Sequence, residues 1–387
     1  MKHDQLRHLR SLRLLLSQDK SPLGFFLAAG CPRSVKDGGN PILPDMRGLT
    51  QIISDAHETD AADSPYKRLM KEMGKADKDT ENVEDVLTFI RSMKEVAAGG
   101  SVRGFSEAEL KALEIDICDK IAESVKKDLP DGENSYRRFA KWVSAIDRAV
   151  PVEVFTTNYD LLLEQAFEEQ YVPCFDGFSG SRYPFFDIHS VERNDLPPYW
   201  ARLWKLHGSV NWKVLGKNVS RVTKDVAGSP ELIYPSKLKY DQSRKMPFLA
   251  MSDRLTAFLL KPHAVLLICG YSFSDEHIND TMINALKVNK SANVIALMFG
   301  KMADAAGNPY SPEAVNRAKE RPNLSVWYDD KAIMGTQEYE WAEYETDNKD
   351  FAGFDLNIVD KRVSLGDFDA FTSFLKQLIG DHSDADK

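Results

Sequence analysis

The chain has 387 residues, of which 43% are hydrophobic and 28% are charged, a composition typical of a soluble globular protein. Lysine and arginine total 50 against 59 aspartates and glutamates, so the net charge of −9 argues against tight binding to nucleic acid or to an anionic membrane. At about 150 residues per domain, the length predicts two or three folding units, and one elaborated α/β domain is also allowed.

Cysteine usage and hydropathy set expectations about the compartment. The four cysteines, Cys31, Cys118, Cys174 and Cys269, are isolated, and no pair has the spacing of a zinc knuckle. No apolar run approaches the roughly 20 residues that span a bilayer, and the N-terminus does not resemble a secretory signal. We therefore expect a cytoplasmic protein in a reducing environment, with no metal and no membrane contact.

Residues 1–20 predict an amphipathic helix, because leucines recur at helical spacing and arginines occupy another face. A helix packed on the body of the protein is the simplest interpretation, and a transit peptide or a docking arm for a partner are the alternatives. The residues concerned are Leu6, Leu9, Leu12 and Leu16, and Arg7, Arg10 and Arg13.

Short apolar runs that end in small or polar residues predict the strands of a parallel sheet. Strands buried on both faces lose polar alternation, and helical stretches lie between several of these runs. The pattern favours a doubly wound, Rossmann-like α/β fold. The runs are residues 24–30, 152–158, 202–208, 264–272, 293–300 and 324–330.

The segment 61–149 is strongly helical and highly charged, and it predicts a large helical subdomain inserted into the sheet. Ser106 with Glu109 three residues later predicts a capping box at the start of one helix. We expect the Rossmann-like core in residues 21–60 and 150–330, and a helical tail in 331–387. Apolar helix faces are Val83, Val86, Leu87, Ile90 and Met93 before Gly99-Gly100, and Phe371, Phe374, Leu375 and Leu378 before Gly380.

Ligands of open parallel sheets bind outside the carboxyl ends of the strands, where this chain has "AAGCPRS", "TTNYD", "LHGS" and "GYSFSDEH". Taken singly, each stretch has an ordinary structural interpretation. Asn158 and Asp160 both suit helix caps, and His207 suits a buried turn. Ser274 suits an N-cap, with Asp275 and Glu276 favoured by the helix dipole.

The order of these motifs resembles the sirtuin-type NAD-consuming domain. The matching stretches are "AAGCP" (28–32), "PDMR" (44–47), "TTNYD" (156–160), "LHGS" (206–209) and "GYS" (270–272). The longer stretches "FTTNYDLLLEQAF", "KLHGSVNW" and "GYSFSD" resemble bacterial sirtuin-like proteins of antiphage systems, such as Thoeris effectors and the partners of HerA ATPases.

The chain departs from the sirtuin pattern at several positions. Ala28 and Pro32 replace a glycine and a serine of the first loop, and Met46 replaces a phenylalanine. Residues 209–262 contain no cysteine where deacetylating sirtuins carry a four-cysteine zinc module. We therefore expect neither zinc nor a zinc-supported peptide groove.

The resemblance implies that NAD is the substrate and that the bond between nicotinamide and ribose is cleaved. Asn158 would hold a ribose hydroxyl or a water, and His207 would act as general base, which makes these two the predicted catalytic residues. The loop backbone of Gly30 and Cys31 would meet the phosphates, and Asp160 would orient the asparagine turn. The predicted cofactor-binding residues are Ala29, Gly30, Cys31, Asp45, Arg47, Thr157, Asp160, Gly270 and Ser272.

We therefore predict an NAD hydrolase that releases nicotinamide and ADP-ribose and acts as the NAD-depleting effector of an antiphage system. The resemblance implies a HerA-type ATPase ring as partner. A toxic hydrolase needs control by another chain or by self-assembly, so we also expect a homo-oligomer. We expect no direct contact with nucleic acid. The alternatives are a protein deacylase or ADP-ribosyltransferase, and a non-catalytic NAD- or ADP-ribose-binding assembly subunit.

Overall fold

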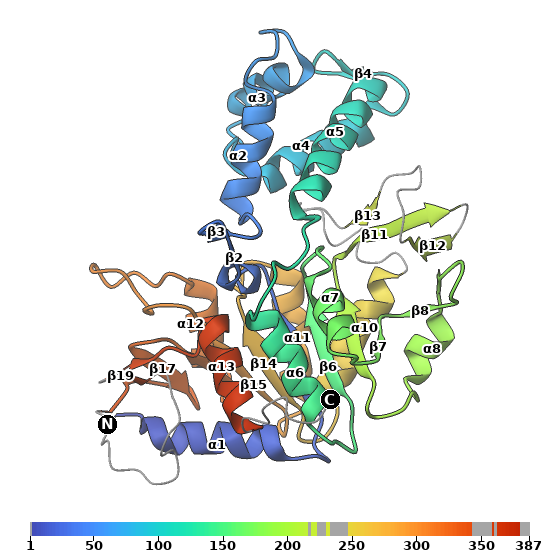
Figure 1. Ribbon diagram of the computed structural model, residues 1–387. Helices are drawn as coiled ribbons and strands as arrows, with labels where there is room; N and C mark the ends of the chain where they lie inside the picture. Colours follow the sequence, from blue (N-terminus) through green and yellow to red (C-terminus); the bar gives the residue numbers. More distant parts are fainter. Residues whose placement is uncertain are drawn as a thin grey trace.

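The computed structural model describes residues 2–215, 218–222, 230–232, 247–342, 358–359 and 362–379. The chain forms an α/β body around a large sheet, and a helical arm projects from one edge of that body (Figure 1). The helices are α1 (Gln5–Ser17), η1 (Cys31–Ser34, one 3₁₀ turn), α2 (Met46–Ala56), α3 (Pro65–Lys75), α4 (Val83–Ala97), α5 (Glu107–Val125), α6 (Ser135–Ala145), α7 (Leu162–Glu169), α8 (Ile188–Arg193), α10 (Phe248–Leu259), α11 (Glu276–Val288), α12 (Pro312–Glu320) and α13 (Phe368–Leu378).

The main sheet has the strand order β18-β17-β16-β15-β14-β1-β6-β10-β7, and it is parallel from β16 to β7. Each of the six apolar runs expected as strands contributes one of them, so the predicted Rossmann-like parallel sheet is confirmed. The strands are β1 (Leu23–Leu27), β6 (Val152–Thr156), β7 (Cys174–Phe175), β10 (Ala201–Lys205), β14 (Val265–Cys269), β15 (Asn293–Leu297), β16 (Leu324–Trp327), β17 (Lys331–Met334) and β18 (Gln337–Glu340).

The strand order reverses between β1 and β14, which are hydrogen-bonded neighbours. After β1 the chain builds outward through β6 to β10, whereas after β14 it builds in the opposite direction through β15 to β16. The connections that follow the two strands therefore part at this point. A crevice outside the carboxyl ends of the strands is expected there, and it is the usual ligand position in open α/β sheets.

Helices cover both faces of the sheet, and the strand side chains alternate between two cores. Phe25 and Leu27 of β1 pack in the core that contains α1, α6 and α13, whereas Phe26 packs in the core that contains α10, α11 and α12. Because both faces are buried, most strand positions carry apolar residues, which explains the largely apolar runs in the sequence. Some of the other positions hold buried charged residues with hydrogen-bond partners, namely Glu153 of β6 and Arg202 and Lys205 of β10.

The helical arm comprises α2, α3, α4 and α5, which pack against one another. The predicted capping box is present, since the Ser106 hydroxyl accepts from the Glu109 N–H and the Glu109 side chain accepts from the Ser106 N–H. The apolar face predicted for α4 is buried. α2 falls in the range 21–60 yet packs within the arm, and α6 falls in 61–149 yet packs on α7 and α13 of the body.

The segment after residue 330 begins with strands rather than with the expected helix. β17 and β18 form an antiparallel hairpin at the edge of the sheet, and Gly335 and Thr336 form its two-residue turn with φ of 55° and 71°. A turn with two positive φ angles matches the twist of paired strands, which accounts for the hairpin. The predicted last helix is present as α13, and its expected end at Gly380 lies outside the described residues.

The first helix packs on the body, as the simplest interpretation of its sequence required. Leu9, Leu12 and Leu16 of α1 are buried, and α1 lies along the edge of the body opposite the arm (Figure 1). The backbone of His3 pairs with the chain beyond β18, because its N–H donates to Glu340 and its carbonyl accepts from Ala342. This backbone pairing thus fixes the segment before α1 to the edge of the body.

A second, antiparallel sheet lies beside the carboxyl end of the main sheet, in the order β13-β11-β12-β9-β8. Its strands are β8 (Phe178–Ser179), β9 (Phe185–Phe186), β11 (Gly208–Leu215), β12 (Asn218–Arg221) and β13 (Pro230–Leu232). Two-stranded ribbons complete the fold: β2 (Lys36–Asp37) with β3 (Asn40–Pro41), β4 (Ser101–Val102) with β5 (Phe105–Ser106), and β19 (Ile358–Val359) with β20 (Arg362–Val363).

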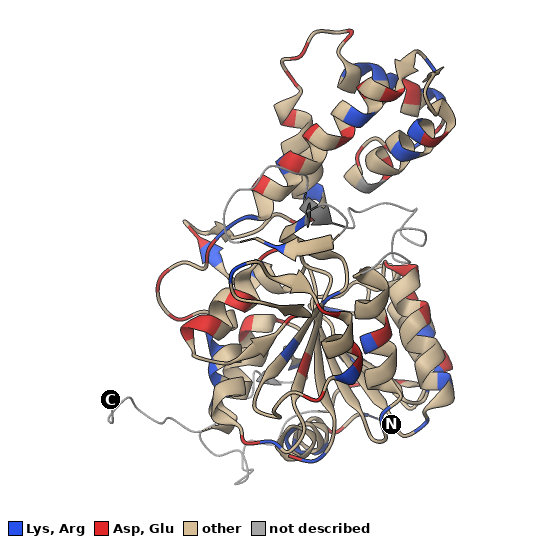
Figure 2. Cartoon of the chain, turned by 90° about the vertical axis from the view of Figure 1, so that its right-hand side faces the viewer, with Lys and Arg blue, Asp and Glu red and all other residues tan. Residues whose placement is uncertain are grey.

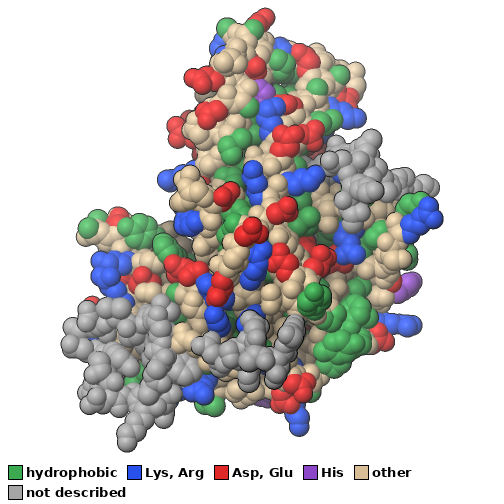
Figure 3. Space-filling view, viewed as in Figure 1, with side chains coloured by type: hydrophobic (Ala, Val, Ile, Leu, Met, Phe, Trp, Pro, Cys, Tyr) green, Lys and Arg blue, Asp and Glu red, His purple; other side chains and the backbone are tan. Residues whose placement is uncertain are grey.

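The surface carries charges of both signs. Acidic and basic residues are interspersed along the arm (Figure 2), and side chains of both signs are mixed over the face of the arm and body in Figure 3. Within the described parts of the chain, no helix combines the length and apolar character needed to cross a membrane.

Candidate active site

The loops after β1 and β14 touch backbone to backbone at the point where the strand order reverses. The Gly30 N–H donates to the Gly270 carbonyl at 2.9 Å. A Cβ atom added at Gly30 would lie 2.6 Å from the Gly270 Cα, and one added at Gly270, where φ is +68°, would lie 2.6 Å from the Cys31 nitrogen. Both positions therefore require glycine, and these two loops form a rigid floor for the site.

Asn158 reaches across from the end of β6 to the loop that follows β1. Its side-chain amide donates to the Ala28 carbonyl at 3.3 Å, and its N–H donates to the Thr156 hydroxyl at 3.0 Å. That hydroxyl in turn donates to the Leu27 carbonyl at 2.6 Å. Asn158 does not cap a helix, because α7 begins only at Leu162.

Asp160 provides the capping interaction instead, since its Oδ1 accepts from the Leu162 N–H at 3.1 Å. Burial raises the pKa of its carboxyl group to about 6, against the opposing effect of the Lys205 ammonium. Lys205 is itself buried and donates to the Asp160 carbonyl and, at 2.8 Å, to the Glu164 carboxylate. These buried charges join the end of β10 to the start of α7.

His207 follows β10 and lies beside a carboxylate from the loop after β14. Its Nε2 is 3.1 Å from Oδ2 of Asp275, and both side chains are buried, with 9% and 7% of their surface exposed. Asp275 is also the N-cap of α11, where Ser274 was expected. The Ser274 hydroxyl instead lies 2.9 Å from that of Ser272, so the cap prediction was wrong by one residue.

Tyr271 is buried below this loop. Its hydroxyl donates to Oδ1 of Asn279 at 2.8 Å and to the Asp275 carbonyl at 3.1 Å. Its ring packs against Phe26 and Phe273. The large side chain therefore supports the loop, in addition to lining the cavity described below.

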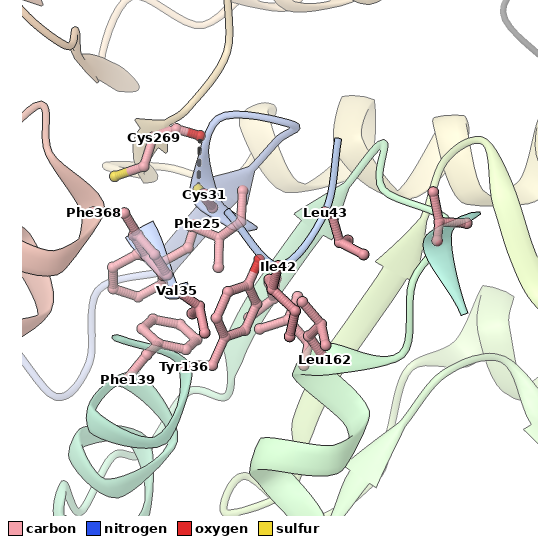
Figure 4. Close-up of a cluster of buried hydrophobic side chains, with 14 of the residues drawn as sticks. Phe25, Cys31, Val35, Ile42, Leu43, Tyr136, Phe139, Leu162, Cys269 and Phe368 are labelled. Carbon is pink, nitrogen blue, oxygen red and sulfur yellow. Dashed lines mark hydrogen bonds between the residues drawn. The ribbon is translucent and has the colours of Figure 1, made fainter. Parts of the chain in front are cut away.

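The loop after β1 is closed on itself. The Cys31 N–H donates to the Ala28 carbonyl, and the buried Cys31 thiol donates to the Cys269 carbonyl at 3.3 Å (Figure 4). Burial raises the pKa of this thiol well above its ordinary value. The N–H groups of both Gly30 and Cys31 are thus engaged within the protein, so they do not present donors to a phosphate as the resemblance implied.

The start of α6 supports this loop from the body. The Ser34 hydroxyl lies 2.6 Å from that of Ser135 and donates to the Cys31 carbonyl at 2.7 Å. Tyr136 is buried beside Val35 and Ile42 (Figure 4), and its hydroxyl makes no well-formed hydrogen bond. Burial raises the pKa of Tyr136, and the Asn158 side chain opposes this shift, which places the phenol next to the amide.

The arm provides the remaining wall. Asp45 caps α2 by accepting from the Gly48 N–H at 2.9 Å, and it forms an ion pair with Arg33. Met46 and Leu49 of α2 and Val125 of α5 face the strand ends across the cavity.

Together these groups enclose a cavity of about 390 Å³, which is in the usual range for small-molecule sites. Of the predicted site residues, Gly30, Cys31 and Arg47 do not line it, and Arg47 is exposed on the first turn of α2. Asp275, Tyr159 and Asn82 line it without having been predicted; the position of Asp275 after a strand end was the available signal for it. The predicted residues that do line it are Ala29, Asp45, Thr157, Asn158, Asp160, His207, Gly270 and Ser272.

The charge of the lining is one-sided. Asp45, Asp160 and Asp275 contribute carboxyl groups, whereas no lysine or arginine of the described ranges lines the cavity. Among the same residues, no group of three histidine, cysteine or acidic side chains is placed to hold a metal ion. The cavity therefore favours a neutral or cationic ligand group over an anionic one.

Comparison with known families covers a part of the chain that supplies half of the residues lining this cavity. Residues 152–326 match the family model of the SIR2-like domain. The SIR2-like segment begins at β6 and ends in β16, so it contains Asn158, His207 and Asp275. Among curated proteins, none matches this chain.

Solved structures of Sir2 proteins also resemble the chain, although loosely. One is a Sir2 homologue in complex with NAD, with 13% identity over 77% of this chain and 84% of that chain and a TM-score of 0.34. Another comes from work on the mechanism and regulation of Sir2 enzymes, with 14% identity over 76% and 85% and a TM-score of 0.36. The fold of this chain is established by its own strand order, and residues 152–326 are similar to the SIR2-like domain.

Proposed function

We propose that the protein is an NAD glycohydrolase that cleaves the bond between nicotinamide and ribose and releases nicotinamide and ADP-ribose. The observation that carries the proposal is the convergence of Asn158 and His207 on one cavity at the carboxyl edge of the sheet, inside a SIR2-like segment. The leaving nicotinamide is neutral and needs no proton, so the reaction requires no general acid, and an uncharged amide with an imidazole base suits it.

The cavity fits the nicotinamide riboside half of NAD. Nicotinamide in NAD carries a positive charge, which suits a lining with carboxyl groups and without lysine or arginine among the described residues. The apolar side chains of Met46, Leu49 and Val125 form a wall against which a flat ring can pack. The ribose then lies toward the strand ends, where Asn158 and His207 are placed.

The chemistry balances with water as the second substrate. Water adds to the anomeric carbon of the ribose, and the carbon–nitrogen bond breaks with its electron pair passing to nicotinamide. Asn158 would hold a ribose hydroxyl or the water, and His207 would accept the proton that the water loses. The interaction of Asn158 with the Ala28 carbonyl fixes the amide orientation before the substrate arrives.

The test is NAD turnover by the purified protein, followed as nicotinamide and ADP-ribose by chromatography. Loss of a general base costs about 10²- to 10⁴-fold, so His207→Ala should lower kcat by that amount, and Asn158→Ala should lower it comparably. His189→Ala and Asn284→Ala, at exposed positions, serve as matched controls and should retain full turnover. Equal activity of all four variants would exclude the assigned site.

We further propose that this activity depletes NAD during antiphage defence, in a cytoplasmic homo-oligomer controlled by a HerA-type ATPase ring. The support is the resemblance of "FTTNYDLLLEQAF", "KLHGSVNW" and "GYSFSD" to sirtuin-like proteins of such systems. Sedimentation of the chain alone and with the ATPase tests the assembly, and phage challenge of cells that express both tests the role. No co-sedimentation would remove the partner from the proposal.

A second candidate, a subunit that binds NAD or ADP-ribose without cleaving it, is favoured by one observation. The N–H groups of Gly30 and Cys31 are hydrogen-bonded within the protein, and Pro32 supplies no hydroxyl. Calorimetric binding of ADP-ribose, together with no NAD turnover even when the ATPase is present, would establish this function in place of hydrolysis.

A further inference from the structure

His207 and Asp275 form a pair that joins two strand ends across the sheet. His207 follows β10 and Asp275 follows β14, and between these strands lie β6 and β1. The 3.1 Å separation of Nε2 and Oδ2 is a hydrogen-bond distance, and the burial of both side chains strengthens the interaction.

The two carboxylate oxygens of Asp275 have separate partners. Oδ1 accepts from the N–H groups of His277 and Ile278, at 3.1 Å and 3.2 Å, and so caps α11. Oδ2 faces the His207 ring. The cap therefore fixes the carboxylate, and the fixed carboxylate orients the imidazole.

The loop that carries Asp275 is itself held in one conformation. Phe273, two residues before it, is buried and has φ of +61°, which is unfavourable for a bulky side chain. The Asn279 amide donates to the Phe273 carbonyl at 2.7 Å, and the Tyr271 hydroxyl donates to the Asp275 carbonyl. Strain of this kind persists only where the surroundings enforce it, and here it fixes the position of Asp275.

We propose that Asp275 is the positioning residue of the reaction. It holds the His207 imidazole with the proton on Nε2, which leaves Nδ1 as the atom that accepts a proton, and it stabilises the imidazolium that this transfer forms. The predicted effect of Asp275 on the reaction rate rests on the proposed NAD hydrolysis. The predicted tautomer of His207 does not depend on that function.

The other titratable groups that line the cavity have different roles. Asp45 pairs with Arg33, and Asp160 accepts from a backbone N–H of α7. The Tyr159 ring lies 6.4 Å from the His207 ring, measured between centroids. Tyr271 donates its hydroxyl proton below the loop. Asp275 is therefore the carboxylate to substitute.

Asp275→Asn tests the proposal with little change to the fold, because asparagine caps helices about as well as aspartate. The two N–H groups of α11 require an oxygen at the Oδ1 position, so the amide nitrogen takes the place of Oδ2. The N–H of that amide donates to Nε2 of His207, which must then carry no proton. The neutral ring therefore has its proton on Nδ1. The variant thus keeps the cap and reverses the tautomer.

The loss of a carboxylate that orients a histidine costs about 10- to 100-fold in metal sites, and an Asp-to-Asn change that reverses the tautomer of a general base costs about 10⁴-fold in Ser-His-Asp triads. We therefore expect kcat for NAD to fall by about 10- to 10⁴-fold, with KM changed by less than about two-fold. The acid limb of the pH–rate profile should move to lower pH, because the base loses a neighbouring negative charge. Asp367→Asn, which replaces the cap of α13 away from the cavity, is the matched control and should leave both unchanged.

The tautomer is measured directly by two-bond ¹H–¹⁵N correlation spectra of histidine-labelled protein, with His207→Gln to assign the signal. The wild type should show the Nε2–H form, and Asp275→Asn should show the Nδ1–H form. The positioning role would be overturned by an Nδ1–H form in the wild type. It would also be overturned if a folded Asp275→Asn variant kept the tautomer or the kcat of the wild type. If the wild type does not cleave NAD, the proposed function fails, and the tautomer measurement still decides for or against the pair.

Discussion

Asp160 leads to a prediction about stability that follows from its burial. Its carboxyl group is 5% exposed, and desolvation raises its pKa from 3.8 to about 6 in spite of the nearby Lys205. The folded state therefore binds a proton more tightly than the unfolded chain does. The resulting stabilisation is complete below the unfolded value and is lost as the pH rises through the folded value of about 6.

The magnitude follows from these two pKa values. At about pH 5 the unfolded carboxyl is almost fully ionised and the folded one is mostly protonated, which stabilises the fold by about 1 kcal/mol, whereas at about pH 8 the contribution is close to zero. Asp160→Asn keeps an oxygen for the Leu162 N–H and removes the titration. The stability of the wild type relative to the variant should therefore fall by about 1 kcal/mol between the two pH values.

Urea unfolding followed by tryptophan fluorescence, at about pH 5 and about pH 8, measures this difference. Asp63→Asn, at an exposed position in the arm, is the control, and its stability relative to the wild type should be the same at both pH values. A relative stability of Asp160→Asn that is constant within about 0.3 kcal/mol would refute the reasoning, because this is the usual scale of independent surface effects.

Three further substitutions test other parts of the structure. Gly270→Ala should destabilise the fold by about 2–5 kcal/mol through backbone overlap and strain, whereas Gly300→Ala, with a similar φ of +76° but open space, should cost only about 1–2 kcal/mol in the same urea assay. Tyr136→Phe should change the free energy of unfolding by no more than about 1 kcal/mol. It should lower NAD turnover, because the hydroxyl that it removes lies next to the Asn158 side chain. Ser106→Ala should lower the thermal midpoint through loss of about 1 kcal/mol of capping and leave NAD turnover unchanged.

The central sheet was predictable because burial on both faces of β1, β6 and β14 favours apolar residues at most positions, and such runs are distinctive in a sequence. The hairpin β17–β18 was missed because its turn contains Thr336 at a positive φ angle, a conformation that the residue type does not predict. The arm does not coincide with the predicted range 61–149, because it includes α2 and excludes α6. Both are amphipathic helices, and sequence periodicity does not reveal which layer a helix joins.

The candidate site was predictable to the extent that polar residues follow strand ends. Asn158 and His207 were found in this way, and the structure brings both to one cavity. The partner of His207 was not found, because Asp275 is distant from it in sequence and has the ordinary character of a helix cap. The sequence around Asp275 indicates its role as a helix cap, but it does not indicate the contact with His207, which forms only in the fold.

The contact between Gly30 and Gly270 has a consequence for the size of the ligands that the cavity can hold. The backbones of the two loops are in direct contact, without side chains between them. No side-chain rearrangement at this contact can therefore enlarge the cavity on this side. The opposite side is formed by Met46, Leu49 and Val125, which belong to a helical layer outside the sheet. A ligand in the cavity therefore meets backbone of fixed position on one side and apolar side chains of the arm on the other, so differences in ligand size fall on the arm side chains.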